Sequence, residues 1–152
     1  MLFHRMRPWM LKGILNLYGP YLGAGVRIRH IDSEWRSAEV SLSLHWYNRN
    51  AVGTHFGGSL YSMVDPHVML LLMQRLGTDY IVWDKTASIQ FLRPGKGTVT
   101  CAIEVPDEAV EGIKQATENG AVHLPEFSLE VKDADSTVVA RIHKQLYVRK
   151  KG

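Results

Sequence analysis

The stretch GGSLYSMVDPHVMLLLMQRL, residues 57–76, decides the fold of this chain. It is long enough for several helical turns and is apolar nearly all round, which is typical of a helix buried inside a protein. A helix that spans a membrane needs about 20 predominantly apolar residues, whereas Asp65, Pro66, His67 and Gln74 interrupt this run. We therefore expect a buried central helix and no membrane span.

The sequence on both sides of this helix has the alternation of β-strands. In residues 37–44 every even position is apolar and every odd position is polar, which predicts a strand with one buried and one wet face. Further strands are predicted over residues 26–31, 80–92, 98–105, 127–132 and 137–148. The last two flank a turn at residues 133–136 and are expected to form a hairpin.

Two more helices are predicted outside the central one. An amphipathic first helix is expected over roughly Met6 to Leu17, ended by Gly19-Pro20 and the glycines at 23 and 25. A short exposed helix is expected over 107–118, after Pro106. The order of elements predicts an α+β fold in which a curved antiparallel sheet wraps one long central helix, the hotdog arrangement. We expect one domain over residues 1–152, with an extra N-terminal helix and turn in residues 1–25 packed on it.

Composition excludes several classes of protein. The one cysteine, Cys101, permits neither an internal disulfide nor a multi-cysteine metal site, and its strand-like surroundings indicate a buried small hydrophobe. The seven histidines show no ligand spacing, so we predict no metal and no cofactor. The net charge of +3 mildly favours anionic partners, but no basic stripe with interleaved aromatics indicates nucleic-acid binding. We expect a cytoplasmic protein.

The start of the central helix carries the first chemical signal. Gly57 and Gly58 open it, and glycine lets a ligand approach the backbone closely. The first amides of a helix have no partner within it and sit at the positive end of its dipole. Such amides can hold a carbonyl oxygen as it gains negative charge. The alternative is a tight turn from loop to helix without a chemical role.

Asp65 is the second signal, because it is the one acidic residue in this apolar helix. An ionised carboxylate buried without partners is very costly, so Asp65 must find donors, reach a water-filled cleft or take up a proton. A carboxylate held near a cleft is a candidate general base; the alternative is a structural, hydrogen-bonding Asp. Gly57 and Asp65 are eight residues apart, about 12 Å along a helix. Because a base and an oxyanion donor for one carbonyl must lie closer, we expect a two-fold homodimer with sites at the interface, and possible tetramers.

These residues resemble the motif of the hotdog-fold acyl-CoA thioesterases, which has an Asn, a Gly-Thr, a His-Gly-Gly and then an Asp on the central helix. The chain is similar to a bacterial branch of that superfamily filed as a domain of unknown function. The similar segments span nearly the whole chain: Tyr-Leu-Gly-Ala-Gly (21–25), Thr-His-Phe-Gly-Gly-Ser-Leu (54–60), Val-Trp-Asp-Lys (82–85) and Phe-Leu-Arg-Pro-Gly (91–95). The resemblance implies hydrolysis of an acyl thioester, with acyl-CoA or another acyl-thioester small molecule as the partner.

The resemblance also implies roles for single residues. Asp65 would be the general base or the nucleophile, and the Gly57 amide, beside Gly58, would polarise the thioester carbonyl. Asn50 would orient the attacking water or the carbonyl. Ser88 and Gln90, on the next strand, are candidates for a supporting polar group.

Further substrate contacts are expected from three residues, and two of them depart from the family pattern. Arg93 is a candidate anchor for the phosphates of coenzyme A. The family's His directly precedes the glycines, whereas here Phe56 occupies that position and His55 lies one residue earlier, so a role for His in orienting the thioester is lost or shifted. In addition, Pro66 follows Asp65 and is expected to kink the helix there.

Two alternative functions remain open. A non-catalytic acyl-CoA or fatty-acid binder would keep the pocket but would need no base. A hotdog dehydratase or hydratase is suggested by His55-Phe56-Gly57, which is similar to the start of the acyl-carrier-protein dehydratase motif. However, the proline-rich continuation and the helix Glu of that motif are absent.

Overall fold

The computed structural model describes residues 6–152 of the chain, so residues 1–5 of the predicted single domain lie outside it. The helices are α1 (Pro8–Asn16), α2 (Gly19–Ala24), α3 (Gly57–Ser62), α4 (His67–Leu76) and α5 (Asp107–Ala116). The strands are β1 (Val26–Ile31), β2 (Ser37–Ser43), β3 (Tyr80–Phe91), β4 (Thr98–Glu104), β5 (Val122–His123), β6 (Glu126–Lys132) and β7 (Val138–Lys150). The predicted long strands are all present, with bounds that differ from the prediction by at most two residues.

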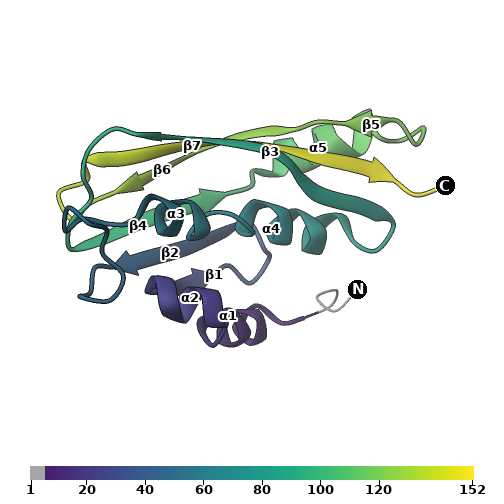
Figure 1. Ribbon diagram of the computed structural model, residues 1–152. Helices are drawn as coiled ribbons and strands as arrows, with labels where there is room; N and C mark the ends of the chain where they lie inside the picture. Colours follow the sequence, from purple (N-terminus) through teal and green to yellow (C-terminus); the bar gives the residue numbers. More distant parts are fainter. Residues whose placement is uncertain (1–5) are drawn as a thin grey trace.

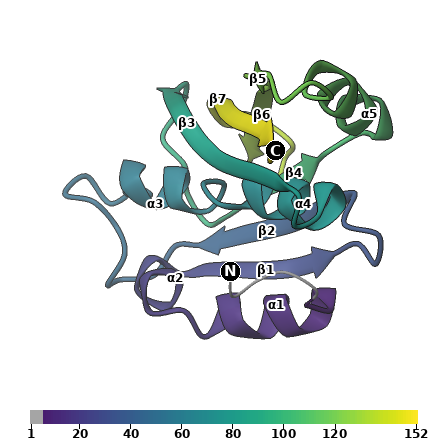
Figure 2. The same cartoon turned by 90° about the vertical axis from the view of Figure 1, so that its right-hand side faces the viewer.

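One antiparallel sheet curves around α3 and α4, as Figures 1 and 2 show. Its strand order is β1-β2-β4-β6-β7-β3, and β5 pairs with β7. The longest pairing runs from Tyr80 opposite Lys150 to Phe91 opposite Ala140, with an irregularity between Asp84 and Thr86. The predicted architecture, a central helix wrapped by a curved antiparallel sheet, is confirmed.

The core forms between the central helix and the inner face of the sheet. Fully buried side chains of the helical segment include Met63, Val64, Val68 and Leu72. On β2 the predicted alternation of buried and wet positions holds except at Ser41, which is buried and bonded to Arg29. Cys101 is buried, as predicted. None of the helices in residues 6–152 is long and apolar enough to cross a bilayer.

The central helix is interrupted where Pro66 predicts a kink. α3 ends at Ser62, the chain makes turns over residues 63–66, and α4 begins at His67. Proline has no N–H to donate to the carbonyl four residues earlier, and its ring crowds the preceding turn. The two helices follow one another along the sheet (Figure 1). Asp65 therefore lies in an irregular segment between two helices rather than on a helix.

The N-terminal region differs from its prediction. Gly19-Pro20 and the following glycines predict a turn, whereas residues 19–24 form α2, which ends at Gly25 with a φ of 81°. Proline is tolerated in the first turn of a helix, because the N–H that it lacks has no partner there. The short strand β5 is also missing from the prediction.

The two edges of the sheet differ in how they are covered. The Asn16 side chain on α1 accepts a hydrogen bond from the Ile28 amide at 2.8 Å and donates one to its carbonyl oxygen at 3.1 Å. Lys12 donates to the Arg29 carbonyl oxygen at 2.7 Å. Side chains of α1 thus take the place of a neighbouring strand along β1. At the other edge, the outer side of β3 has no strand partner among the described residues.

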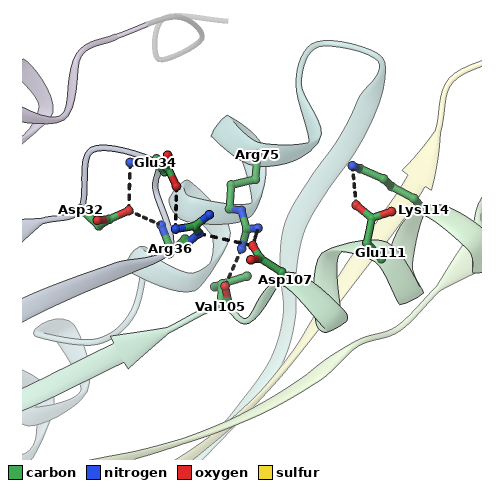
Figure 3. A network of polar contacts seen from close by, with 8 residues as sticks. All are labelled: Asp32, Glu34, Arg36, Arg75, Val105, Asp107, Glu111 and Lys114. Atoms are coloured by element: carbon green, nitrogen blue, oxygen red, sulfur yellow. Dashed lines mark hydrogen bonds and ion pairs between the residues drawn. The ribbon is translucent and has the colours of Figure 1, made fainter.

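A polar clamp joins α4 to the strands and to α5 (Figure 3). The largely buried Arg75 side chain donates to the Val105 carbonyl oxygen and pairs with Asp107. The exposed Arg36 lies 3.5 Å from the same Asp107 carboxylate and 2.6 Å from Glu34. The clamp fixes the far end of α4, and with it the direction in which the central helix crosses the sheet.

Candidate functional site

Asp65 has hydrogen-bond donors and also reaches solvent. Its carboxylate accepts a hydrogen bond of 2.6 Å from the Tyr61 hydroxyl, one helical turn earlier. Burial, followed by the bond to Asp65, raises the pKa of Tyr61, so the phenol stays protonated and donates. About 45% of the Asp65 side chain remains exposed. The carboxylate is therefore held in place while one side of it stays open to water or a ligand.

Lys144 is the other partner of Asp65, and it is completely buried. Its ammonium donates to the Asp65 main-chain carbonyl oxygen and lies 3.4 Å from the Asp65 carboxylate. Its Nζ also lies 2.9 Å from Asp84 Oδ1 on β3. This contact is an ion pair, and its angles are not those of a hydrogen bond. Two carboxylates and a carbonyl thus compensate one buried cation, which would otherwise be very costly.

Asp84 completes this arrangement, and we use the name Asp65 cluster for Tyr61, Asp65, Asp84 and Lys144. Burial raises the pKa of the Asp84 carboxyl, and the Lys144 ammonium opposes that shift. The Lys144 ammonium also lies 5.9 Å from the centre of the Tyr61 ring. The cluster gathers three segments distant in sequence: the helix break, β3 and β7.

Most of this cluster is missing from the sequence prediction, although the signal for it is present. The side chains of residues 140, 142, 144, 146 and 148 on β7 all face inward and are buried. Lys144 is the one charged residue in that series, and Asp84 likewise follows the buried Val82 at the inward spacing on β3. A lysine at an inward strand position, with an aspartate on a neighbouring strand and another on the buried helix, predicts a buried ion pair.

His67 and Tyr21 form a second buried polar pair beside the cluster. The Tyr21 hydroxyl lies 3.2 Å from His67 Nε2. Burial, with a smaller effect of Lys144, lowers the pKa of His67 to about 3, and burial raises the pKa of Tyr21. His67 is therefore neutral near pH 7 and serves as a packed, hydrogen-bonded core residue.

A cleft of about 650 Å³ lies at the start of α3. Four of the predicted site residues line it, namely Asn50, His55, Gly57 and Arg93. The apolar side chains of Leu60 and Phe91 and the exposed Lys96 also border it. The structure therefore brings the predicted helix-start residues together with a basic residue after β3.

The glycines at the helix start leave room for two phenylalanine rings. A Cβ atom on Gly57 would lie 2.8 Å from the Phe91 ring, and one on Gly58 would lie 2.5 Å from the Phe56 ring. The Phe56 carbonyl oxygen accepts the amides of Ser59 and Leu60. The amides of Gly57 and Gly58 precede these and have no acceptor within the helix. Neither amide has an acceptor among residues 6–152, so they are the free donors that the sequence predicts at this position.

The His55 side chain is buried and hydrogen-bonded within the chain. It is 3% exposed, and its Nε2 lies 3.0 Å from the Gly97 carbonyl oxygen. Since a carbonyl only accepts, Nε2 carries the proton, and Nδ1 has no partner among the described residues. Burial lowers the pKa of His55, so the ring is neutral and Nδ1 is an acceptor.

Asn50 is engaged within its own loop. Its side-chain oxygen accepts the amides of Val52 and Thr54 at 3.1 and 3.0 Å. Its side-chain nitrogen donates to the Thr54 hydroxyl at 2.9 Å and to the His55 carbonyl oxygen at 3.2 Å. Asn50 therefore shapes the wall of the cleft, and the predicted role in orienting water stays a prediction.

Other predicted residues lie apart from the cleft. Asp65 is not among the residues that line it, since α3 separates it from Gly57. Ser88 and Gln90 are exposed on β3, opposite His143 and Arg141 of β7. Within residues 6–152, no group of three or more His, Cys, Asp or Glu side chains is arranged to hold a metal ion. The chain thus holds a carboxylate site and an amide-lined cleft at two separate places.

Comparisons with known proteins identify a family and several solved structures that this chain resembles. The family described as "Domain of unknown function (DUF4442)" matches residues 7–148. No curated protein matches the sequence at a significant level. Among solved structures, the protein PA5026 of Pseudomonas aeruginosa, of unknown function and described as a probable thioesterase, is similar with a TM-score of 0.79. It is 19% identical, and the likeness covers 94% of this chain and 96% of that one.

Two further structures extend the comparison. The thioesterase HI1161 of Haemophilus influenzae has a TM-score of 0.69 at 14% identity, over 99% of this chain and 96% of that one. The PaaI protein from the phenylacetic acid degradation operon of E. coli has a TM-score of 0.61 at 16% identity, over 95% and 93% of the two chains. At such identities the likeness establishes the fold, and the predicted hotdog arrangement is confirmed.

Proposed function

This chain belongs to the DUF4442 family, and from that premise and the geometry of the Asp65 cluster we propose that it hydrolyses acyl thioesters, acyl-CoA foremost, in sites shared by two subunits. The observation that carries the proposal is the Asp65 carboxylate, held by Tyr61 and Lys144 in the break between α3 and α4 and open to solvent on one side. The similar structures described as thioesterases agree with this reaction class.

The reaction needs the two halves of the site to meet. Water attacks the thioester carbonyl, the carbon–sulfur bond breaks, and the products are a carboxylic acid and a thiol. Asp65 takes the proton from the attacking water as a general base. The unpaired amides of Gly57 and Gly58 stabilise the oxyanion. A direct attack by the Asp65 carboxylate on the carbonyl is the alternative first step.

A two-fold dimer through β3 would bring these halves together. The outer edge of β3 is unpaired among the described residues, and an exposed strand edge is a template for pairing with another chain. Phe56, Phe91 and Leu92, near the start of α3 and the end of β3, are exposed apolar side chains. A symmetric contact there places the same elements of both chains face to face, with Gly57 of one protomer toward Asp65 of its partner.

The cleft residues suggest how the carrier would be held. Arg93 and Lys96 supply positive charge at the mouth of the cleft, which suits the phosphates of coenzyme A. Phe56 stands where the acyl-CoA thioesterase motif has its His, and the His55 side chain is bonded to the Gly97 carbonyl oxygen. Polarisation of the thioester therefore rests on the backbone amides, with Ser88 or Gln90 of β3 as candidate polar support.

The test is release of free thiol from acyl-CoA esters that range from acetyl to long-chain and aryl. The wild type should turn over at least one class, and Asp65→Asn should lower kcat about 100-fold or more, because a positioned base contributes 10²–10⁴-fold. Asp135→Asn, in the exposed hairpin turn, is the matched control and should leave kcat unchanged. An Asp65→Asn variant as active as the wild type would remove Asp65 from the mechanism.

The second candidate function is non-catalytic binding of acyl-CoA or a fatty acid. It is favoured by one observation: the polar atoms of Asn50 and the Nε2 of His55 are already bonded within the chain. A binder should take up acyl-CoA equally well with Asp65→Asn and release no thiol in either form. Binding measured by calorimetry beside the thiol assay separates the two functions.

A further inference from the structure

The two N-terminal helices expose an unusual amount of apolar side chain. Trp9 and Leu17 are 67% and 78% exposed. On α1 the residues at 9, 10, 13, 14 and 17 share one side of the helix, while Leu11 and Leu15 on the other side are buried in the core. We use the name N-terminal apolar face for the exposed set Trp9, Met10, Ile14, Leu17, Tyr18 and Leu22.

This face lies away from the proposed dimer contact. α1 and α2 lie beneath β1, at the opposite end of the strand order from β3 (Figures 1 and 2). The bonds from Asn16 and Lys12 to β1 hold α1 with its other side against the sheet. The apolar side chains are therefore presented outward on a fixed helix, and no element in residues 6–152 covers them.

A basic hollow adjoins the N-terminal apolar face. It has a volume of about 350 Å³, and its lining includes Leu22, Arg27, Arg29, His45 and Tyr47 but no Asp or Glu. Arg29 Nε donates to the Ser41 hydroxyl at 2.7 Å, which fixes its guanidinium over β1 and β2. Leu22 belongs to both features, so the apolar face and the basic hollow form one continuous surface.

The charge of this part of the chain has one sign. Residues 1–31 contain five Lys or Arg and no Asp or Glu, whereas the rest of the chain carries 13 basic and 15 acidic residues. One acid, Asp32, borders Trp9 and Lys12, and the backbone amides of Glu34 and Arg36 lower its pKa and keep it ionised. Glu34 pairs with Arg36. Glu39 lies on β2 opposite His30. Lys12, Arg27 and Arg29 outnumber Asp32 around the apolar face and the basic hollow, so this surface is net positive.

We propose that the N-terminal apolar face and the basic hollow dock this protein on a bilayer of anionic phospholipid. Trp9, Leu17 and Tyr18 enter the headgroup boundary, where aromatic and aliphatic side chains of interfacial helices bury their apolar surface. Arg27 and Arg29 bind a headgroup phosphate in the hollow, at the same level. A symmetric contact with a second copy would instead bring positive charges together, which disfavours it. The inference is independent of the proposed hydrolysis.

Sedimentation of the full-length chain with vesicles tests this surface. Vesicles of phosphatidylcholine alone are compared with vesicles containing roughly one third phosphatidylglycerol. We expect binding to the anionic vesicles, little binding to the neutral ones, and release at high salt, because screening weakens exposed charges. Arg27→Gln with Arg29→Gln should weaken binding roughly 30-fold, at about fivefold for each charge. Trp9→Ser with Leu17→Ser should weaken it by roughly tenfold or more.

Matched controls make the result decisive. Arg149→Gln with Lys150→Gln removes the same charge from the end of β7, and Val122→Ser changes an exposed apolar residue of β5; both should bind as the wild type does. Unchanged thermal unfolding shows that each variant is folded. Equal binding to neutral and anionic vesicles, or full binding by the double arginine variant, overturns the proposal. A change in oligomeric mass of the Trp9 and Leu17 variant without a change in vesicle binding also overturns it, because the face is then a contact between copies.

Discussion

At the scale of single residues, Lys144 connects stability with the candidate chemistry. Its ammonium is the only positive group that the structure places within 4 Å of the Asp65 and Asp84 carboxylates, as far as the described residues go. A buried ion pair adds little when compared with an apolar replacement of both partners, but losing one partner strands the other. Removing Lys144 is therefore expected to destabilise the fold, because the Asp84 and Asp65 carboxylates would lose their counter-charge.

Lys144→Met should lower the free energy of unfolding by about 3 kcal/mol, because it leaves the partly buried Asp84 carboxylate without its counter-charge. Adding Asp84→Asn should restore part of that loss. Urea unfolding measures both variants. Lys114→Met breaks an exposed ion pair with Glu111 and should change stability by less than about 0.5 kcal/mol. Equal effects of the two lysine substitutions would contradict the view that burial sets the cost.

His67 predicts a dependence of stability on acid. Its pKa is about 3 in the folded chain, against about 6.5 when unfolded, so the unfolded state binds more protons between these values. Stability from this residue is complete above about pH 6.5 and is lost as the pH falls toward 3. Between pH 6.5 and 5 the wild type should lose about 2 kcal/mol more than His67→Gln. His30→Gln, at an exposed position, is the matched control for loss of a histidine in the same urea series.

Residue-scale prediction from sequence works where one amino acid conflicts with its pattern. Asp65 stands out because it is acidic within an apolar run, and its partners agree with the expectation that it must find donors. Lys144 conflicts with its strand in the same way, since the other even positions from 140 to 148 are apolar, but which carboxylates it pairs with depends on how β7, β3 and the helix break meet in space. The direction of the His55 ring depends on the Gly97 carbonyl oxygen, 42 residues later, and such a contact has no local signature.

At the scale of elements, strong periodicity in the sequence predicts the strands and the buried helix. The predicted and observed elements differ where glycine and proline are taken as the end of a helix. Gly19-Pro20 is read as a turn because both residues break helices in their interiors. At the first turn of a helix the same residues are compatible with α-structure, and burial of Tyr21 beside His67 favours α2. Only tertiary packing distinguishes the two outcomes.

The clamp at the end of α4 gives an element-scale prediction. Arg75→Met removes the donor to the Val105 carbonyl oxygen and should lower the free energy of unfolding by about 2 kcal/mol, the cost of a buried acceptor left unpaired. Arg36→Met leaves that bond intact and removes only exposed ion pairs, so it should cost about 0.5 kcal/mol or less. Thermal unfolding of the two variants measures the difference. Equal shifts in Tm would show that Asp107, which both arginines contact, accounts for the clamp.

At the scale of the whole molecule, the separation of Gly57 from Asp65 has a direct test. Asp65→Asn and Gly57→Val should each inactivate the protein, the second because its side chain meets the Phe91 ring and fills the cleft. If the sites are shared, random mixing of the two variants after unfolding should restore roughly a quarter of wild-type activity, since half of the dimers are mixed and each has one intact site. No recovery, with mixed dimers verified by mass, would place each complete site within a single chain.

The position of β7 in the sequence has a consequence for how the protein is made. β3 pairs with residues that are synthesised between 49 positions later (Phe91 with Ala140) and 70 positions later (Tyr80 with Lys150). At about 5–20 residues per second, a nascent chain exposes β3 and the uncompensated carboxylates of Asp65 and Asp84 for several seconds before their partners leave the ribosome. Such long-range pairings also fold slowly. Until β7 is synthesised, β3 therefore lacks the partner that it pairs with along its whole length, which makes it the segment most open to wrong strand pairing while the chain is made.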